Sequence, residues 1–205
     1  MRLPKLYESV ILIDAEFLIN MINDNYAFYT DLYKGRKFPQ IELSRIIKII
    51  ASTARILQEN EKVNVVFFSK LGNDILPHTT EPNSLFVFAD FINNPVQCII
   101  NNCVFEFAYY FADSEEIEED EEEYYKEFGE LLLGAAYDQN TFNICIIADN
   151  EYYNYYLDRF ADKLDKTFFV FKGLDSGLGV DSSKFSTVTF DYVIARCMGL
   201  NESEW

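Results

Sequence analysis

The sequence predicts an α/β protein: a three-layer sandwich in which helices cover both faces of a mostly parallel central sheet. Short apolar runs rich in β-branched and aromatic residues alternate with segments of helical periodicity, which is typical of such folds. Several of these runs are continuous, as in strands that are buried on both faces. The chain has 205 residues, of which 49% are hydrophobic. This length and composition suit one domain with a sizeable core, so we expect residues 1–205 to form a single α/β domain.

The first half of the chain is expected to contain two strands and two helices. Val10 to Ile13 is an apolar run that leads directly into Asp14, as a buried parallel strand does at its end. Ile46, Ile49 and Ile50 fall on one face at helical spacing. The expected elements are a strand at 10–14, a helix beginning within 16–22, a polar aromatic loop at 24–39, a helix at 41–58 and a strand at 62–68.

The second half of the chain is expected to alternate strands and helices in the same way. Residues 96–111 combine β-branched and aromatic side chains, which favours two strands in a hairpin around Asn101 and Asn102. The other expected elements are a loop at 71–84, a short strand at 85–88, helices at 121–137, 151–163 and 191–198, and strands at 142–148, 167–171 and 186–190.

The chain is strongly acidic, with 34 Asp and Glu residues, 17 Lys and Arg residues and a net charge of −17. Nine of the acids lie within residues 113–123, which we interpret as a solvated acidic insertion. This composition disfavours broad binding of nucleic acid through Lys and Arg, although a metal ion can still meet a phosphate. The expected partners are therefore RNA at a metal site or a basic protein held by the acidic segment. The sequence does not define an oligomeric state.

The cysteines and the apolar runs indicate a cytoplasmic protein. Cys145 lies in an apolar strand and Cys197 in the expected last helix, so both are expected to be buried free thiols. Cys98 and Cys103 have no histidine nearby, and the single histidine, His78, lies in a polar loop, which argues against a zinc site. The sequence has no signal-peptide pattern and no long uninterrupted apolar run, so no membrane span is expected.

An aspartate follows three of the expected strands: Asp14, Asp149 and Asp191. The carboxyl ends of parallel strands meet at one edge of a sheet, where open α/β sheets bind ligands, so these side chains are candidates for a shared site. Each could instead cap the helix that follows, since Asp is a preferred N-cap residue. Glu16 and Glu151 come shortly after Asp14 and Asp149, and are either further ligands or acids of a first helical turn.

The helix expected at 121–137 offers a further acid. Glu127 and Glu130 share one helix face with apolar neighbours, and either point inward or belong to a solvated acidic face. Carboxylates that converge without a basic partner repel one another, and Mg²⁺ or Mn²⁺ relieves this repulsion because both ions prefer oxygen ligands. Such an ion can activate water for attack on a phosphodiester. The sequence therefore predicts a Mg²⁺ or Mn²⁺ site.

The order of these motifs resembles the PIN-like superfamily, nearest its NYN domain branch. That family opens with an apolar strand followed by Asp-Gly-Glu-Asn-Leu, and this chain reads ILIDAEFL, so Asp14, Glu16 and Leu18 match. Ala15 and Phe17 stand at the positions of the Gly and the Asn.

Two later motifs extend the resemblance. The family sequence Ser-Gly-Asp-Ser-Asp-Phe corresponds to IADNEY, in which Asp149 matches the first acid and Glu151 replaces the second. Asp191 fits the acid that opens the last helix of the family, and Glu130 is the best candidate for its helical acid.

The resemblance implies a Rossmann-type PIN-like sandwich that binds Mg²⁺ or Mn²⁺ and cleaves RNA. By this resemblance the metal ligands and catalytic residues are Asp14, Glu130, Asp149 and Asp191, and Glu151 supports them as a further metal ligand. The alternative is a catalytically decayed PIN-like protein that acts as a protein-interaction module.

Two other folds with similar openings fit less well. A receiver domain also begins with a strand that ends in acids, but here the next strand regions end at Ser69 and near Asp90, at unsuitable spacing. A dinucleotide-binding fold needs a Gly-rich turn after the first strand, and the sequence has none. A metal-dependent endoribonuclease and a decayed interaction module are therefore the two functions left open.

Overall fold

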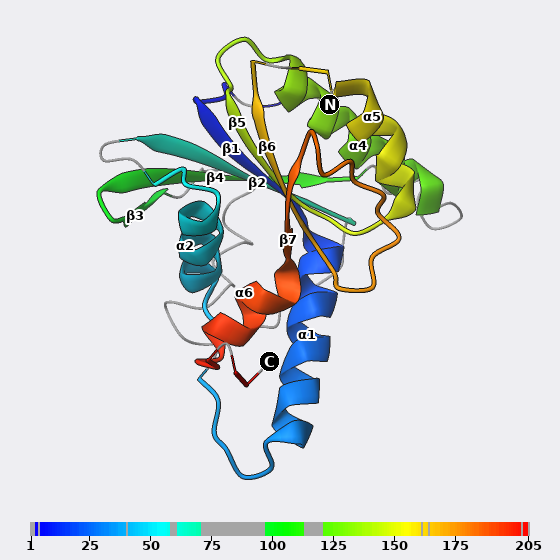
Figure 1. Ribbon diagram of the computed structural model, residues 1–205. Coiled ribbons are helices and arrows are strands. Elements are labelled where there is room, and N and C mark those ends of the chain that lie inside the picture. Colours follow the sequence, from blue (N-terminus) through cyan, green and yellow to red (C-terminus); the bar gives the residue numbers. More distant parts are fainter. Residues whose placement is uncertain are drawn as a thin grey trace.

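One sheet of seven strands forms the centre of the molecule (Figure 1). The computed structural model describes residues 3, 5–39, 41–57, 61–70, 97–112, 121–160, 162–163, 165–201 and 203–204. Only β3 and β4 are antiparallel, and the other neighbouring strands of the sheet are parallel, so the predicted α/β fold class is confirmed. In spatial order the strands are β3 (Gln97–Ile100), β4 (Cys103–Phe111), β2 (Lys62–Ser69), β1 (Ser9–Asp14), β5 (Asn143–Ile147), β6 (Thr167–Lys172) and β7 (Ser186–Thr189).

Helices cover both faces of the sheet and complete the three layers (Figure 1). The helices α1 (Ala15–Leu32), α2 (Leu43–Thr53) and α6 (Phe190–Cys197) pack on one face. The opposite face carries α4 (Glu121–Tyr137), the short 3₁₀ helix η2 (Glu151–Tyr153) and α5 (Asn154–Phe160). All residues of β1 are buried because alternate side chains enter the two cores, which explains its continuous apolar sequence.

The first helix is longer than the sequence predicts. Residues 24–39 are expected to form a loop, whereas α1 continues to Leu32. Asn25 and Tyr29 lie on its buried face, and Asn25 Nδ2 donates to Oδ1 of Asp191 at 3.2 Å. The prediction fails here because the polar and aromatic residues of this segment are stabilised as a helix by α6, a partner distant in sequence.

The second helix is shorter than the predicted span of 41–58. It ends at Thr53 because Arg55 adopts a left-handed conformation with φ of 58°. The backbone N–H of Arg55 donates to Ser52 O, and that of Ile56 donates to Ala51 O. This is the hydrogen-bond pattern of a Schellman motif, which satisfies the last carbonyl groups of a helix, here with an arginine in the usual glycine position.

The hairpin predicted around Asn101 and Asn102 is confirmed. Ile100 and Cys103 pair across its turn, and φ is 51° at Asn101 and 66° at Asn102. Positive φ at both central residues is the signature of a type I′ turn, which asparagine tolerates. The loop predicted at 71–84, the strand at 85–88 and residues 113–120 of the acidic run lie outside the described residues.

The segment after β5 also differs from its prediction. A single helix is expected over 151–163, whereas the chain forms η2 first and then α5, which ends at Phe160. Cys145 and Cys197 are buried free thiols, as predicted. Burial raises the pKa of both, in the case of Cys197 to about 12. In the described part of the chain, no helix has the length and apolar composition needed to cross a membrane.

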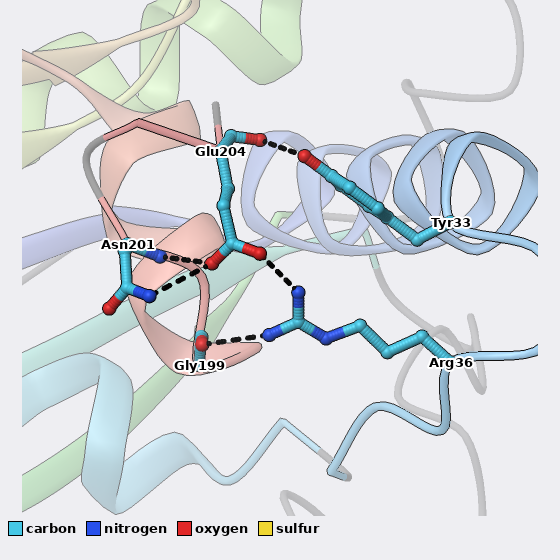
Figure 2. A network of polar contacts seen from close by, with 5 residues as sticks. All are labelled: Tyr33, Arg36, Gly199, Asn201 and Glu204. Atoms are coloured by element: carbon cyan, nitrogen blue, oxygen red, sulfur yellow. Dashed lines mark hydrogen bonds and ion pairs between the residues drawn. The ribbon is translucent and has the colours of Figure 1, made fainter.

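A polar clasp joins the C-terminal residues to the end of α1 (Figure 2). Arg36 donates to Oε1 of Glu204 at 2.5 Å and to the carbonyl oxygen of Gly199 at 3.2 Å. The hydroxyl of Tyr33 donates to the carbonyl oxygen of Glu204 at 2.7 Å, and Asn201 donates to its side chain through both nitrogens. The chain after α6 is thereby fixed against the segment between α1 and α2.

Candidate functional site at the carboxyl edge of the sheet

Asp14 and Asp149 lie at the same edge of the parallel sheet, as the strand patterns predict. β1 and β5 are parallel neighbours, and Ile13 is in register with Ile147. The chain passes from β1 to β2 on one side and returns to β5 on the other, so the order of strands reverses between β1 and β5. Open α/β sheets bind ligands in the crevice outside the carboxyl ends of the strands at such a switch point.

A pocket of about 330 Å³ lies at this switch point. Its lining residues are Asp14, Glu16, Phe17, Asn20, Met21, Lys70, Tyr124, Tyr125, Asp149 and Asn150. Three of these residues are acids, in agreement with the expected convergence of carboxylates. Lys70 also lines the pocket, with its ammonium nitrogen 5.6 Å from the centre of the Tyr124 ring. The acids of the pocket therefore lie beside a basic residue, which was not expected from the sequence.

The carboxylate of Asp14 is almost fully buried and hydrogen-bonded by other residues of the protein. Oδ1 accepts from the hydroxyl of Tyr124 at 2.7 Å and from the backbone N–H of Phe17 at 3.3 Å. Oδ2 accepts from the hydroxyl of Tyr153 at 2.7 Å. Only 3% of the residue is exposed. Asp14 therefore caps α1, as the alternative interpretation of this residue predicted, and it also ties β1 to α4 and η2.

Burial has the largest effect on the pKa of Asp14. The pKa of Asp14 is raised above its ordinary value by desolvation, because a charge is costly to remove from water. The hydrogen bonds from Tyr124, Tyr153 and Phe17 stabilise the charged form and oppose the rise, while the nearby charge of Glu16 adds to it. Burial raises the pKa of both tyrosines, and repulsion between a phenolate and the carboxylate of Asp14 adds to the rise.

Asp149 holds the loop that follows β6. Its Oδ2 accepts from the backbone N–H of Gly173 at 3.0 Å, and its Oδ1 accepts from the hydroxyl of Ser176. A Cβ at position 173 would lie 2.5 Å from Oδ2 of Asp149, so the close approach requires glycine. Asp149 does not cap η2, because Asn150 is the residue at that position and accepts from Tyr152 N.

Asp191 and Glu16 hold neighbouring segments by the same means. Oδ1 of Asp191 accepts from Asn25 of α1, and Oδ2 accepts from the backbone N–H of Leu174 at 3.1 Å. The N-cap of α6 is Thr189, so Asp191 is an acid of the first turn and not the cap. Oε1 of Glu16 accepts from the backbone N–H of Lys70 at 3.3 Å and from the hydroxyl of Ser69.

The other acids expected in the site are exposed. Glu130 lies on the solvent side of α4, and Glu151 lies on η2. Among the residues that the structure describes, no three His, Cys, Asp or Glu side chains are placed to hold a metal ion together. Asp14 and Asp149 share the pocket, whereas Asp191, Glu130 and Glu151 do not line it. Donors of the chain itself form hydrogen bonds with Asp14, Asp149 and Asp191 in this arrangement.

The residues that sequence reasoning missed are the donors to these acids. Tyr124 and Tyr153 lie in helices far from Asp14 in sequence, and no local pattern marks them as its partners. The position of Lys70 could have been predicted from the sequence. It directly follows β2, and the carboxyl ends of the parallel neighbours β1 and β2 lie at the same edge of the sheet. Asn25 lies within the segment that was predicted as a loop.

The fold and this edge define an α/β protein with an acid-lined pocket at the switch point of its sheet. Its sequence matches, over residues 4–204, a family model described as a family of unknown function (DUF6621). The chain therefore belongs to that family. No curated protein and no solved structure matches it significantly.

Proposed function

We propose that the chain is a non-catalytic PIN-like protein that acts as a protein-interaction module and binds a basic protein partner. The proposed binding surface, here called the tyrosine–acid face, lies on the outer side of α4, η2 and α5. It consists of Glu122, Tyr125, Glu130, Tyr152, Tyr155 and Tyr156. Residues 121–123, the last acids of the acidic run, begin α4 and so lie on the same side of the sheet as this surface.

The tyrosines of this face form a preassembled surface, which is the observation that carries the proposal. The rings of Tyr125 and Tyr152 stack at 5.3 Å with an interplanar angle of 11°. The rings of Tyr155 and Tyr156 meet edge to face at 5.3 Å. The hydroxyl of Tyr152 donates to Glu122 at 2.6 Å, yet 43% of Tyr152 and 62% of Tyr155 are exposed. Rigid tyrosines of this kind lose little conformational entropy when a partner binds.

The chemistry of the face selects a cationic partner. Exposed carboxylates at Glu122 and Glu130 attract Lys and Arg, and tyrosine rings add cation–π contacts with the same side chains. Arg159 of the same helix lies 5.5 Å from the centre of the Tyr155 ring, a contact of the kind we propose for a partner's cations. The net charge of −17 speeds the approach of a basic partner and repels nucleic acid.

The carboxyl edge supports a non-catalytic function. An ionised carboxylate has about four lone-pair sites on its two oxygens. Both oxygens of Asp14, Asp149 and Asp191 accept hydrogen bonds from the protein, which leaves fewer of these sites for a metal ion. These bonds give the acids a structural role, which is what we expect when a PIN-like acid cluster has decayed.

The proposal is tested by binding of a short fluorescent Arg-Gly repeat peptide, followed by fluorescence anisotropy at several salt concentrations. We expect the double variant Tyr152→Ser/Tyr155→Ser to bind about tenfold more weakly than wild type, because aromatic anchors dominate binding energy at interfaces. The matched control is Tyr26→Ser, which removes a tyrosine of similar exposure (37%) from α1. None of these substitutions changes the charge, so general electrostatic attraction stays equal.

Two results would contradict the proposal. Equal affinity of the double variant and the control would remove the tyrosine–acid face as the binding surface. Binding that is lost completely at moderate salt, and that does not depend on the tyrosines, would show that the peptide binds only by non-specific electrostatic attraction.

Metal-dependent cleavage of RNA is the second candidate function, favoured by the presence of Asp14, Glu16 and Asp149 in one pocket. Mg²⁺ or Mn²⁺ would be its cofactor. The assay is cleavage of a labelled single-stranded RNA with Mn²⁺ and with a chelator. Cleavage by wild type that Asp149→Asn abolishes and Asp158→Asn retains would support this candidate over the interaction module; Asp158 is exposed on α5.

A further inference from the structure

A second pocket lies between α2, the β3–β4 turn and the end of α6, on the sheet face opposite the tyrosine–acid face. Its volume is about 670 Å³, within the range of roughly 300–1,000 Å³ that is common for small-molecule sites. Three elements that are distant in sequence build its walls, and Figure 1 shows α2 beside the β3–β4 hairpin. The pocket is separate from the acids of the carboxyl edge and from every residue of the proposed interaction surface.

Positive charge is concentrated in this pocket although the chain as a whole has twice as many acids as bases. Arg45, Lys48 and Arg196 line it, and Glu42 is the one acid among the described residues of its lining. In the described residues, none of the three cations forms an ion pair with a carboxylate. Within the described part of the chain, ion pairs thus do not neutralise their charges, and together with Glu42 these three residues give the described lining an excess of two positive charges.

The two arginines are held in place by neutral groups. Arg45 donates through Nη2 to the carbonyl oxygen of Arg196 at 3.0 Å, which joins α2 to the end of α6. Arg196 donates through Nη1 to the hydroxyl of Tyr192 at 2.7 Å. A guanidinium has five N–H donors in a planar fork, so most of the donors of both side chains stay available for an anion.

The remaining walls combine apolar surface with small polar groups. Ile49 lines the pocket from α2, and Ile99 lines it from β3 with 74% of its surface exposed. An exposed isoleucine beside three cations suits a ligand that carries both an anionic group and an apolar body.

We infer that this pocket binds a phosphate monoester of a small organic molecule, with the phosphate held by Arg45, Lys48 and Arg196 and the organic part packed on Ile49 and Ile99. A phosphate monoester carries a charge of about −1.5 to −2 at neutral pH, which matches the excess charge of the pocket. Arginine forks bind phosphate oxygens in a bidentate manner, and lysine adds a point charge. This inference is independent of the proposed interaction with a basic protein.

The test is a titration of the ¹⁵N-labelled full chain with phenyl phosphate, followed by ¹H–¹⁵N NMR at constant ionic strength. Inorganic phosphate and phenol, the two halves of the probe, are titrated separately. We expect saturable shifts of amide signals in α2, the β3–β4 turn and the end of α6, with phenyl phosphate binding more tightly than phosphate and no shifts with phenol.

The variants Lys48→Gln and Arg196→Gln should each weaken phenyl phosphate binding by roughly tenfold, because each removes a charge-assisted contact. Lys48 makes no hydrogen bond or ion pair within the described part of the chain, so Lys48→Gln should leave folding unaffected. The control is Lys34→Gln, which removes the same charge from an exposed lysine that faces Asp31 near the end of α1.

Three outcomes would overturn the inference. The first is the absence of saturable shifts at the pocket, and the second is equal affinity in Lys48→Gln, Arg196→Gln and the Lys34→Gln control. The third is tighter binding of a phosphoserine peptide than of phenyl phosphate with the same dependence on Lys48, which would assign the pocket to a phosphorylated protein.

Discussion

The carboxylate of Asp14 is almost fully buried, and hydrogen bonds from two tyrosines reduce the free-energy cost of this burial. An unpaired buried charge is strongly destabilising, but the hydroxyls of Tyr124 and Tyr153 each donate to one of its oxygens at 2.7 Å. Asp14 therefore links β1 to α1, α4 and η2 through hydrogen bonds. At the scale of single residues, the carboxyl edge is an assembly of acids paired with donors of the same chain.

Removing either hydroxyl should destabilise the fold. We expect Tyr124→Phe and Tyr153→Phe each to lower the free energy of unfolding by about 1–3 kcal/mol, because a buried acceptor loses its donor. The double variant should deviate from additivity, since the two tyrosines share one carboxylate. Urea unfolding followed by circular dichroism measures these values. The control Tyr26→Phe, at an exposed site, should change stability by less than about 0.5 kcal/mol.

The raised pKa of Asp14 predicts a specific dependence of stability on pH. In the folded state Asp14 binds its proton more tightly than in the unfolded state, because burial disfavours the charged form. Its contribution to stability is therefore greatest at low pH and falls as pH rises from the ordinary aspartate pKa through the folded value. The stability of wild type relative to Asp14→Asn should fall over that interval in urea unfolding at a series of pH values. If the stability of wild type relative to Asp14→Asn instead rises with pH, the pKa of Asp14 is depressed in the folded state.

At the scale of elements, the packing of α5 on α4 depends on a glycine. A Cβ at Gly129 would lie 2.2 Å from Cε2 of Tyr156, a distance that forces the ring to move. The ring of Tyr156 therefore occupies the space above this turn of α4, which lets the two helices approach closely.

A double-mutant cycle tests this contact. Gly129→Ala should destabilise the wild type, although alanine is about 1 kcal/mol more favourable than glycine inside a helix. In the background Tyr156→Ala the clash is absent, so the same substitution should stabilise by about that amount. The measurement is the free energy of unfolding of all four proteins, and a stabilising effect of Gly129→Ala in both backgrounds would show that Tyr156 does not fill this space.

The sequence predicts elements well where one local pattern decides the structure. The buried strands, the Asn101–Asn102 turn and the shared edge of Asp14 and Asp149 all follow from local runs and from the geometry of parallel sheets. The length of α1 and the end of α2 do not, because α6 stabilises the former and a left-handed Arg55 sets the latter. The tyrosine partners of Asp14 come from distant helices, so no local pattern could reveal that its oxygens are occupied.

At the scale of the whole molecule, the two proposed binding sites lie on opposite faces of the sheet. Acids and exposed tyrosines lie on the helices α4 and α5, whereas three cations surround the pocket beside α2. The carboxyl edge connects these layers, because its acids bind donors from α1, α4, η2 and the loop after β6. Our central proposal is that hydrogen bonds of the chain, rather than a metal ion, hold this edge together.

Thermal unfolding with and without millimolar Mn²⁺, for wild type and Asp149→Asn, tests this claim most directly. An ion that binds only the folded chain stabilises it by about 2.7 kcal/mol at a hundredfold excess over its dissociation constant. Our account predicts that Mn²⁺ shifts the midpoint of both proteins equally, through weak attraction to the acidic surface. A rise in the midpoint of wild type that Asp149→Asn abolishes, with Asp158→Asn behaving as wild type, would contradict it and establish a metal site at the carboxyl edge.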